Sequence, residues 1–361
     1  MTTRTPEWRY PTSVDPVATD GRDIDTRVAM LDGEGAQQRA ERDGRAATSA
    51  SPAAWDRLPE VVQADPTYYD RPLLKRSPWS IDIPIYYFLG GMAGAALTLG
   101  AAIQLASPRG KHPLRRVSEI CHWTGVAGST AGAAFLIHDL GRPERFLYMM
   151  RVFRPTSPMN MGTWILGGAA PTAITTVLLI NRRGFWGTVG EVTGYLSGIF
   201  GAALAGYTGV LVSNSAIPIW QQARRWVPPL FMASSAATAA SVIDVISPHC
   251  RRCGLTRVFG TAGRVAEIAA SKMVERAAGE FPKLGEPLHK GGTAILWRLA
   301  STLTSASLGA SLLRKRRPRA SVVAGLLGIA GSLCLRFAVH YISNASANDP
   351  RAAFHQQRAV R

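Results

Sequence analysis

Long apolar runs separated by short basic segments are the feature that most constrains this chain. A helix needs about 20 apolar residues to cross the roughly 30 Å hydrocarbon core of a bilayer, and several runs between residues 83 and 342 reach that length. Many of the nine tryptophans stand near the ends of these runs, where indole rings prefer the membrane interface. The pattern predicts an all-α integral membrane protein with several transmembrane helices.

Length, apolarity and helix breakers predict eight transmembrane helices. They cover approximately residues 83–106, 117–139, 160–181, 189–212, 228–247, 257–276, 293–313 and 320–342. Many are rich in Gly, Ala and Ser, which let membrane helices pack closely. The sixth is the exception, because each charge near the bilayer centre costs at least about 2.5–3.5 kcal/mol. Either this span is shielded, with Arg264 and Glu267 paired one turn apart, or it lies at the membrane surface.

The distribution of charge predicts partners and topology. A net charge of +17 would suggest nucleic acid for a soluble protein, but the basic residues form short clusters between apolar runs. We therefore predict a lipid bilayer as partner and no nucleic acid. Short basic loops stay in the cytoplasm, and these stand near residues 109–116, 182–183, 251–252 and 314–319. The prediction is a multi-pass plasma-membrane protein with both termini on the exoplasmic side, here called side one.

The two ends of the chain differ from its apolar middle. Residues 1–67 are hydrophilic and cannot bury enough apolar surface to offset the entropy of ordering, so we predict a mostly disordered tail with a short helix near 35–47. The tail has no apolar h-region, so it is not a cleavable signal peptide. Residues 68–345 form the predicted transmembrane domain, and 346–361 form a C-terminal tail.

The four cysteines do not suggest a disulfide framework. Cys121 and Cys334 lie inside apolar runs, where a small buried thiol is ordinary. Cys250 and Cys253 form a CxxC beside His249, but zinc and iron–sulfur sites usually need four ligands. We therefore favour an ordinary loop over a metal site and predict no metal in this chain.

Polar residues gather near the side-one ends of the predicted helices. These residues are Tyr86, His138, Asp139, Tyr207 and Asn214. A quinone ring needs hydrogen-bond donors of these types, held near a bilayer interface so that its tail can remain in lipid. The alternative is that they are interface anchors and turn caps, and residue types alone favour this alternative.

The connection from Asp139 to Trp164 is denser in charge than a plain connector needs to be. It carries Arg142, Arg145, Arg151 and Arg154 among prolines and aromatic residues. Such a density of charge at a membrane surface indicates a docking or ligand-binding surface.

A weaker polar pattern enters from the opposite side of the membrane. Its members are Glu119, His122, Asp244 and Glu267. Ionisable residues inside a membrane are functional candidates by default, and this set is a candidate proton path. It is equally consistent with groups that are satisfied by Arg264, Lys272 or helix-end carbonyls.

Several of these stretches resemble the NrfD/polysulphide reductase family of membrane subunits. The most specific pair is DLGRPERF at 139–146 followed by RPTSPMNMGTW at 154–164. The stretch 68–94 is similar to the family's entry into its first helix, and YTGVLVSNSAIPIW at 207–220 to the end of its fourth. The closing RF at 336–337 and SANDP at 346–350 also fit. The resemblance covers residue 68 to the C-terminus.

The resemblance implies a specific function. The fold would be two four-helix bundles without haem, metal or another redox cofactor of their own, and without a catalytic residue beyond the quinone pocket. The first bundle would hold menaquinone or ubiquinone, with the pocket tyrosine at Tyr207. Electrons would pass between quinone and a four-cluster ferredoxin-like iron–sulfur subunit, docked at the four arginines, which serves a molybdopterin catalytic subunit. Tyr86 replaces a histidine of the family, and a phenol delivers protons poorly near neutral pH.

Three alternatives remain open at this point. A b-type haem is disfavoured, because His122 and His138 stand at opposite ends of one helix and only His340 lies opposite His138. A transporter or channel is disfavoured, because the sequence shows no evident pair of Pro- or Gly-broken helices in related halves. A purely structural membrane anchor would tether a redox partner without reacting with quinone.

Overall fold

The computed structural model describes residues 23–25, 30–32, 74, 79–107, 113–247, 254–313, 318–349 and 352. The chain divides into two units, Met1–Arg76 and Ser77–Arg361. In the first, β1 (Asp23–Asp25) pairs antiparallel with β2 (Met30–Asp32), which the sequence did not predict. The rest of the predicted disordered tail, the helix near 35–47 and the CxxC at 250–253 lie outside the described residues.

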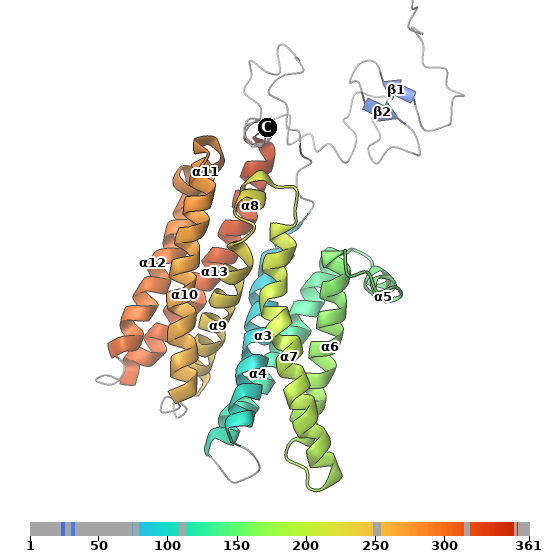
Figure 1. Ribbon diagram of the computed structural model, residues 1–361, viewed down its shortest axis with the longest axis vertical. Coiled ribbons are helices and arrows are strands. Elements are labelled where there is room, and N and C mark those ends of the chain that lie inside the picture. Colours follow the sequence, from blue (N-terminus) through green and yellow to red (C-terminus); the bar gives the residue numbers. More distant parts are fainter. Residues whose placement is uncertain are drawn as a thin grey trace, which may run out of the picture. The chain divides into compact units, whose positions relative to one another are not determined.

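The second unit is built from helices (Figure 1). Its long helices are α3 (Asp82–Ala106), α4 (Pro113–Asp139), α6 (Pro158–Leu179), α7 (Phe185–Ser213), α9 (Val227–Ile246), α10 (Gly254–Gly279), α12 (Gly291–Leu313) and α13 (Pro318–Asn348). Each of the eight predicted segments is therefore a helix. Three short helices were not predicted: α5 (Glu144–Met150), α8 (Pro218–Gln222) and α11 (Pro282–His289).

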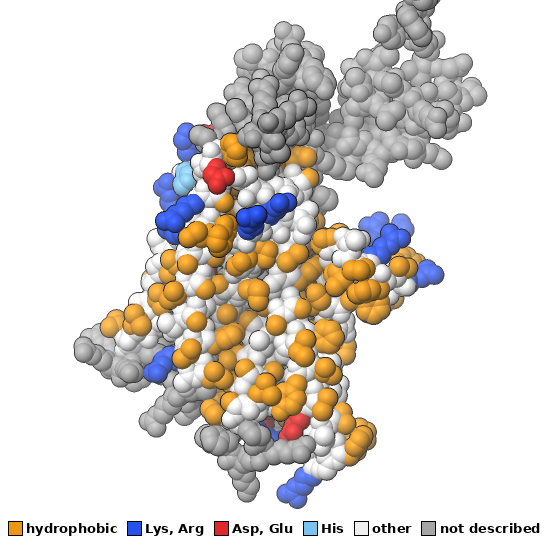
Figure 2. Space-filling model, viewed as in Figure 1, with side chains coloured by type: hydrophobic (Ala, Val, Ile, Leu, Met, Phe, Trp, Pro, Cys, Tyr) orange, Lys and Arg blue, Asp and Glu red, His pale blue; other side chains and the backbone are white. Residues whose placement is uncertain are grey.

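Six of the described helices are long and apolar enough to cross a membrane. They are α3, α4, α6, α7, α9 and α13. Large apolar side chains on their outer faces are exposed, such as Ile199 at 68% and Leu178 at 60%, as expected of surfaces that meet lipid. On the face shown in Figure 2, charged side chains gather towards the two ends of the helices. The protein is a multi-pass membrane protein; the crossing of α10 and α12 stays a prediction.

Small residues let the helices pack closely. A Cβ atom on Gly94 of α3 would lie 2.5 Å from the carbonyl oxygen of Gly201 on α7, and one on Gly201 would lie 2.6 Å from the carbonyl oxygen of Gly94. This backbone contact is the kind that glycine permits between membrane helices. Among the long helices, α3 packs on α4 and α7, and α6 also packs on α4 and α7. Similarly, α9 packs on α10 and α13, and α12 also packs on α10 and α13. The helices α3 and α7 also contact α9.

The antiparallel order of the helices decides which connections share an end. The start of α3, the end of α4, the start of α6 and the end of α7 lie at one end of the unit, together with α5 and α8 (Figure 1). This is the end predicted as side one. The residues predicted to lie near side one therefore stand towards the same end of this unit.

Candidate functional site

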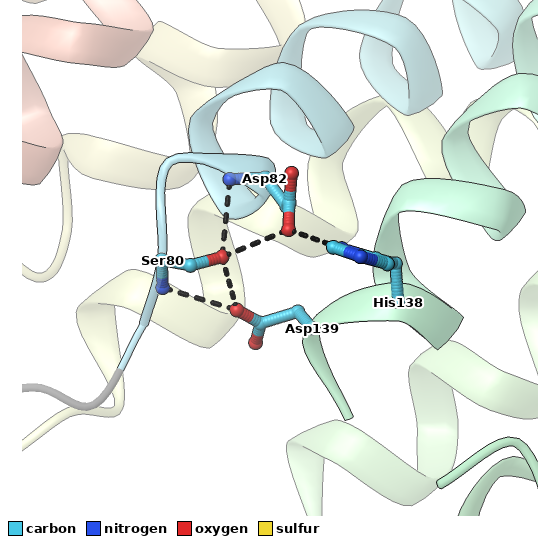
Figure 3. A network of polar contacts seen from close by, with 4 residues as sticks. All are labelled: Ser80, Asp82, His138 and Asp139. Carbon is cyan, nitrogen blue, oxygen red and sulfur yellow. Dashed lines mark hydrogen bonds and ion pairs between the residues drawn. The ribbon is translucent and has the colours of Figure 1, made fainter. Parts of the chain in front are cut away.

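Ser80 joins the end of α4 to the start of α3 (Figure 3). Its backbone N–H and its hydroxyl lie 3.0 Å and 2.6 Å from Oδ1 of Asp139. The same hydroxyl lies 3.1 Å from Oδ2 of Asp82, and Nδ1 of His138 lies 2.7 Å from that oxygen. A serine hydroxyl carries one proton, so it donates to one carboxylate at a time. These four residues form one hydrogen-bonded group, the side-one cluster.

The positions of these residues on their helices explain the cluster. Asp82 is the first residue of α3 and His138 stands in the last turn of α4, where the helix dipole favours an anion and a cation respectively. The His138 side chain is 80% exposed, whereas that of Asp82 is 16% exposed. The cluster therefore connects water to a more buried carboxylate. His138 and Asp139 were among the predicted site residues but Ser80 and Asp82 were not, although an acidic residue in the first turn before an apolar run is a helix-start signal.

Two tyrosines lie one turn further into α3. Tyr86 and Tyr87 are each 1% exposed, and neither hydroxyl makes a hydrogen bond with a described residue. A buried polar group without a partner costs about 1–3 kcal/mol. The ring of Tyr87 packs edge-on against Phe231 of α9, with 6.0 Å between centroids. Each hydroxyl is therefore a buried polar group for which the described residues provide no hydrogen-bond partner.

Tyr207 and Asn214 line an open groove of about 500 Å³ between α6, α7 and α9. The rest of its lining is mostly apolar and includes Met161, Ile165 and Met232. Small-molecule pockets have typical volumes of about 300–1,000 Å³ and combine an apolar lining with a few polar groups. The groove therefore has the size and the chemistry to hold a planar ring.

Gly162 positions the ring of Tyr207. A Cβ atom at residue 162 would lie 1.9 Å from Cζ of Tyr207 and 2.1 Å from its hydroxyl oxygen. Only glycine leaves room for the ring at this point of α6. Gly162 was not among the predicted site residues, although it stands within the motif PMNMGTW.

The five predicted quinone residues thus fall into three places. Tyr207 and Asn214 share the groove, and His138 and Asp139 belong to the side-one cluster through Asp82 and Ser80. Tyr86 is buried in the core and belongs to the same cluster of buried apolar residues as Tyr207. Among the described residues that line the groove, none belongs to the side-one cluster.

The four predicted docking arginines are all exposed, as a docking surface requires. They are Arg142, Arg145, Arg151 and Arg154. The guanidinium of Arg145 donates to the carbonyl oxygen of Leu140 at 2.9 Å.

Asn160, which is 7% exposed, organises the turn that carries two of these arginines. Its amide nitrogen donates to the carbonyl oxygens of Met149 and, at 2.8 Å, Val152. Its Oδ1 accepts from the backbone N–H of Arg154 at 2.7 Å. One side chain therefore satisfies three backbone groups. From the sequence, Asn160 was predicted only as the start of a helix.

The first two members of the predicted proton path lie on α4. Glu119 is partly exposed, with Oε1 3.7 Å from Nε of Arg115. His122 is 1% exposed, and its Nδ1 lies 3.4 Å from the hydroxyl of Ser197 on α7.

The other two members lie on α9 and α10. Asp244 of α9 is 4% exposed and Glu267 of α10 is 3% exposed. Glu267 accepts a hydrogen bond from Thr304 of α12 at 3.1 Å. The predicted set is therefore divided between two groups of helices, and its role as a path stays a prediction.

Arg336 is a buried cation that the predicted sites did not include. It is 1% exposed, and its guanidinium lies 3.9 Å from the centroid of the Phe231 ring. Its NH2 group donates to the hydroxyl of Ser235 at 3.1 Å and to the carbonyl oxygen of Phe231 at 3.2 Å. It also interacts electrostatically with Glu267. In the sequence, an arginine within an apolar run indicates a buried cation of this kind.

Comparison with known proteins agrees with this architecture. The family described as "Polysulphide reductase, NrfD" matches residues 73–253, from ahead of α3 to the connection that follows α9. A search of curated proteins finds no match. The matched part contains the side-one cluster, the groove and the arginine-bearing connection. The chain belongs to the NrfD polysulphide reductase family.

Proposed function

We propose that the chain is the quinone-reactive membrane subunit of a multi-subunit oxidoreductase. Electrons would pass between menaquinone or ubiquinone and an iron–sulfur protein docked on side one. The observation that carries the proposal is the groove lined by Tyr207 and Asn214, which opens at the same end of the helices as the exposed arginines. Membership of the family supports a membrane subunit of a redox complex.

The proposal includes eight crossings in two four-helix bundles, α3–α4–α6–α7 and α9–α10–α12–α13. Its support is that α10 turns its two mid-helix charges, Arg264 and Glu267, inward. The guanidinium of Arg264 donates to Ser307 and Ser241, each at 2.8 Å, and Glu267 accepts from Thr304. Charges satisfied in this way do not meet lipid. The short basic connections would face the cytoplasm, which places both termini on the exoplasmic side of the plasma membrane.

The residues present fit a quinone in the groove. A bound quinone supplies the two-electron chemistry and takes up two protons as it is reduced. The Tyr207 hydroxyl, held in place by Gly162, would donate a hydrogen bond to a ring carbonyl, and the Asn214 amide is a second donor. The apolar lining would hold the ring and leave its tail in lipid. Neither haem nor metal is part of the proposal.

Protons would be exchanged with water through the side-one cluster. His138 is exposed and contacts Asp82, and Ser80 connects Asp82 to Asp139. Tyr86 stands one helical turn from Asp82 and shares a core cluster with Tyr207. These residues would relay protons between the surface and the groove. A relay of this kind would compensate for the poor proton delivery of the Tyr86 phenol.

The partners follow from the exposed arginines. Arginine forms charge-assisted hydrogen bonds with carboxylates, and complementary charge guides association. We propose that Arg142, Arg145, Arg151 and Arg154 bind a four-cluster ferredoxin-like subunit, which in turn serves a molybdopterin catalytic subunit.

The test is the conservative substitution Tyr207→Phe, with Tyr195→Phe on the same helix as the matched control. A fluorescent quinolone N-oxide, which mimics a quinol, is titrated onto the full chain in nanodiscs. We expect Tyr207→Phe to weaken binding at least about tenfold, or roughly 1.4 kcal/mol, and Tyr195→Phe to leave it unchanged. Equal binding by the wild type and Tyr207→Phe would favour a structural anchor without quinone chemistry.

A further inference from the structure

The segment from Phe146 to Phe153 folds back along α6. The rings of Phe153 and Trp164 lie edge to face with 5.9 Å between centroids, and a Cβ atom on Gly167 would lie 3.0 Å from Cε of Met150. Trp164 and Gly167 stand roughly 9 and 14 Å along α6 from its first residue, at 1.5 Å per residue. The segment therefore runs beside a membrane-spanning helix, at the depth of its second and third turns.

The apolar side chains of this segment are uncovered. Leu147, Tyr148, Val152 and Phe153 are 64%, 57%, 55% and 58% exposed. A contiguous apolar surface of this kind is rare in contact with water. The segment lies beside α6, which spans the membrane. We therefore expect lipid to cover these side chains at this depth.

The backbone hydrogen bonds of the segment suit an environment of low polarity. Outside a regular helix, backbone groups at membrane depth must be satisfied by other protein groups. Asn160 donates to the carbonyl oxygens of Met149 and Val152, and accepts from the N–H of Arg154. It thus satisfies three backbone groups where α5 ends and the chain turns back to α6.

The charges of the segment lie apart from its apolar side chains. In Figure 2 the protrusion formed by α5 carries Lys and Arg side chains on one side and hydrophobic side chains on the other. An interfacial segment of this kind buries its apolar face to the level of the acyl chains, and its arginines reach the headgroups.

We propose that residues 146–153 form a lipid-binding bracket, whose apolar side chains insert into the side-one leaflet and hold Arg151, with the flanking Arg145 and Arg154, at the level of the headgroups. The bracket holds the arginines at a fixed height beside the mouth of the groove. The bracket does not depend on quinone chemistry, because only the depth, exposure and hydrogen bonding of this segment support it.

Spin-label accessibility tests the bracket on the full chain in phospholipid nanodiscs. A nitroxide is placed singly at Leu147, Val152, Phe153, Arg145 or Thr156, in a variant whose native cysteines are replaced by serine and which elutes as a single species. Oxygen concentrates in lipid, and a nickel chelate remains in water. We expect oxygen to dominate at the first three positions and the nickel chelate to dominate at Arg145 and Thr156.

Two results would overturn the bracket. Nickel access at Leu147 and Phe153 equal to that at Arg145 would place the segment in water. Low access of both reagents at these positions would mean that protein, rather than lipid, covers the segment.

The substitution Asn160→Leu provides a second measurement. It keeps the size of the side chain but removes both donors and the acceptor, so the carbonyl groups of Met149 and Val152 need water. We expect nickel access at Phe153 to rise severalfold, while Thr175→Val, on the exposed outer face of α6, leaves it unchanged. Unchanged access in Asn160→Leu would contradict a lipid environment for this turn.

Discussion

The ring of Tyr207 on α7 lies directly against the Cα atom of Gly162 on α6. A methyl group at position 162 would overlap the phenol, at 1.9 Å from Cζ and 2.1 Å from the hydroxyl oxygen. The position of the tyrosine in the groove therefore depends on the absence of a side chain on the neighbouring helix. A glycine of the connection motif thus acts on the candidate site without contributing a functional group.

The substitution Gly162→Ala should displace the Tyr207 hydroxyl. We expect the affinity for the fluorescent quinol analogue to fall at least about fivefold, or roughly 1 kcal/mol, with the chain still folded in nanodiscs. Gly309→Ala on α12 is the control, because a Cβ atom there meets nothing within 4 Å. Full affinity in Gly162→Ala would mean that the ring position does not matter for binding.

The substitution Ser80→Ala should loosen the start of α3. It removes the hydroxyl that connects Asp82 and Asp139, and the loss of one such hydrogen bond costs about 1 kcal/mol. Hydrogen exchange of the amides at residues 82, 83, 85 and 86 should then accelerate about fivefold. Ser305→Ala on the exposed face of α12 should leave these amides unchanged, and equal exchange in both variants would remove the cluster's structural role.

The substitution Arg336→Met should destabilise the helices that surround it. Glu267 interacts electrostatically with this guanidinium, and the substitution also removes its hydrogen bonds to Ser235 and to the carbonyl group of Phe231, each worth about 1.5–3 kcal/mol for a charged donor. We expect a clear fall in the thermal unfolding midpoint in detergent. The loss in the double variant Arg336→Met/Glu267→Gln should be smaller than the sum of the two single losses, because the interaction between the two side chains is removed only once.

An exposed pair provides the control for this prediction. Lys272 lies 2.8 Å from Glu275 with its side chain 61% exposed, and such pairs contribute about 0–1 kcal/mol. Lys272→Met should therefore hardly change the midpoint. Strict additivity of the Arg336 and Glu267 substitutions would argue against their coupling.

Charge reversal at Arg145 and Arg151 should release the iron–sulfur partner during purification of the complex in mild detergent. Both side chains are exposed, so the change affects the surface rather than the core. Arg182→Glu/Arg183→Glu, in the connection at the opposite end, is the matched control and should retain the partner. Retention by the Arg145→Glu/Arg151→Glu variant would exclude these residues from the docking surface.

The helices could be predicted because length and apolarity report membrane crossing directly. The first predicted span, 83–106, matches α3 closely. The last was expected to end at 342, but α13 continues to Asn348. Its final turns contain serines that are buried against α8, where the indole N–H of Trp220 donates to Ser343 at 2.7 Å. Apolarity does not report the burial of such residues, so the sequence alone placed the end too early.

The candidate site was predictable only in part. His138 and Asp139 were found because they end an apolar run, but Ser80 meets Asp139 across 59 residues of sequence, and such a pairing leaves no local pattern. The short helix α5 has seven residues, too few for a helical period to show. Glu119 and Glu267 were grouped by their side of the membrane, whereas the structure assigns them to different helix neighbours.

The hydrogen bonds of Arg264 have a consequence for the biogenesis of the protein. Its guanidinium donates to Ser241 of α9 and Ser307 of α12, so these hydrogen bonds form when both helices stand beside α10. During synthesis, α10 reaches the insertion machinery before Ser307 of α12 does. With eight crossings, as proposed, we expect the machinery to retain α9 and α10 until α12 emerges, so that this part of the chain enters the bilayer as a group.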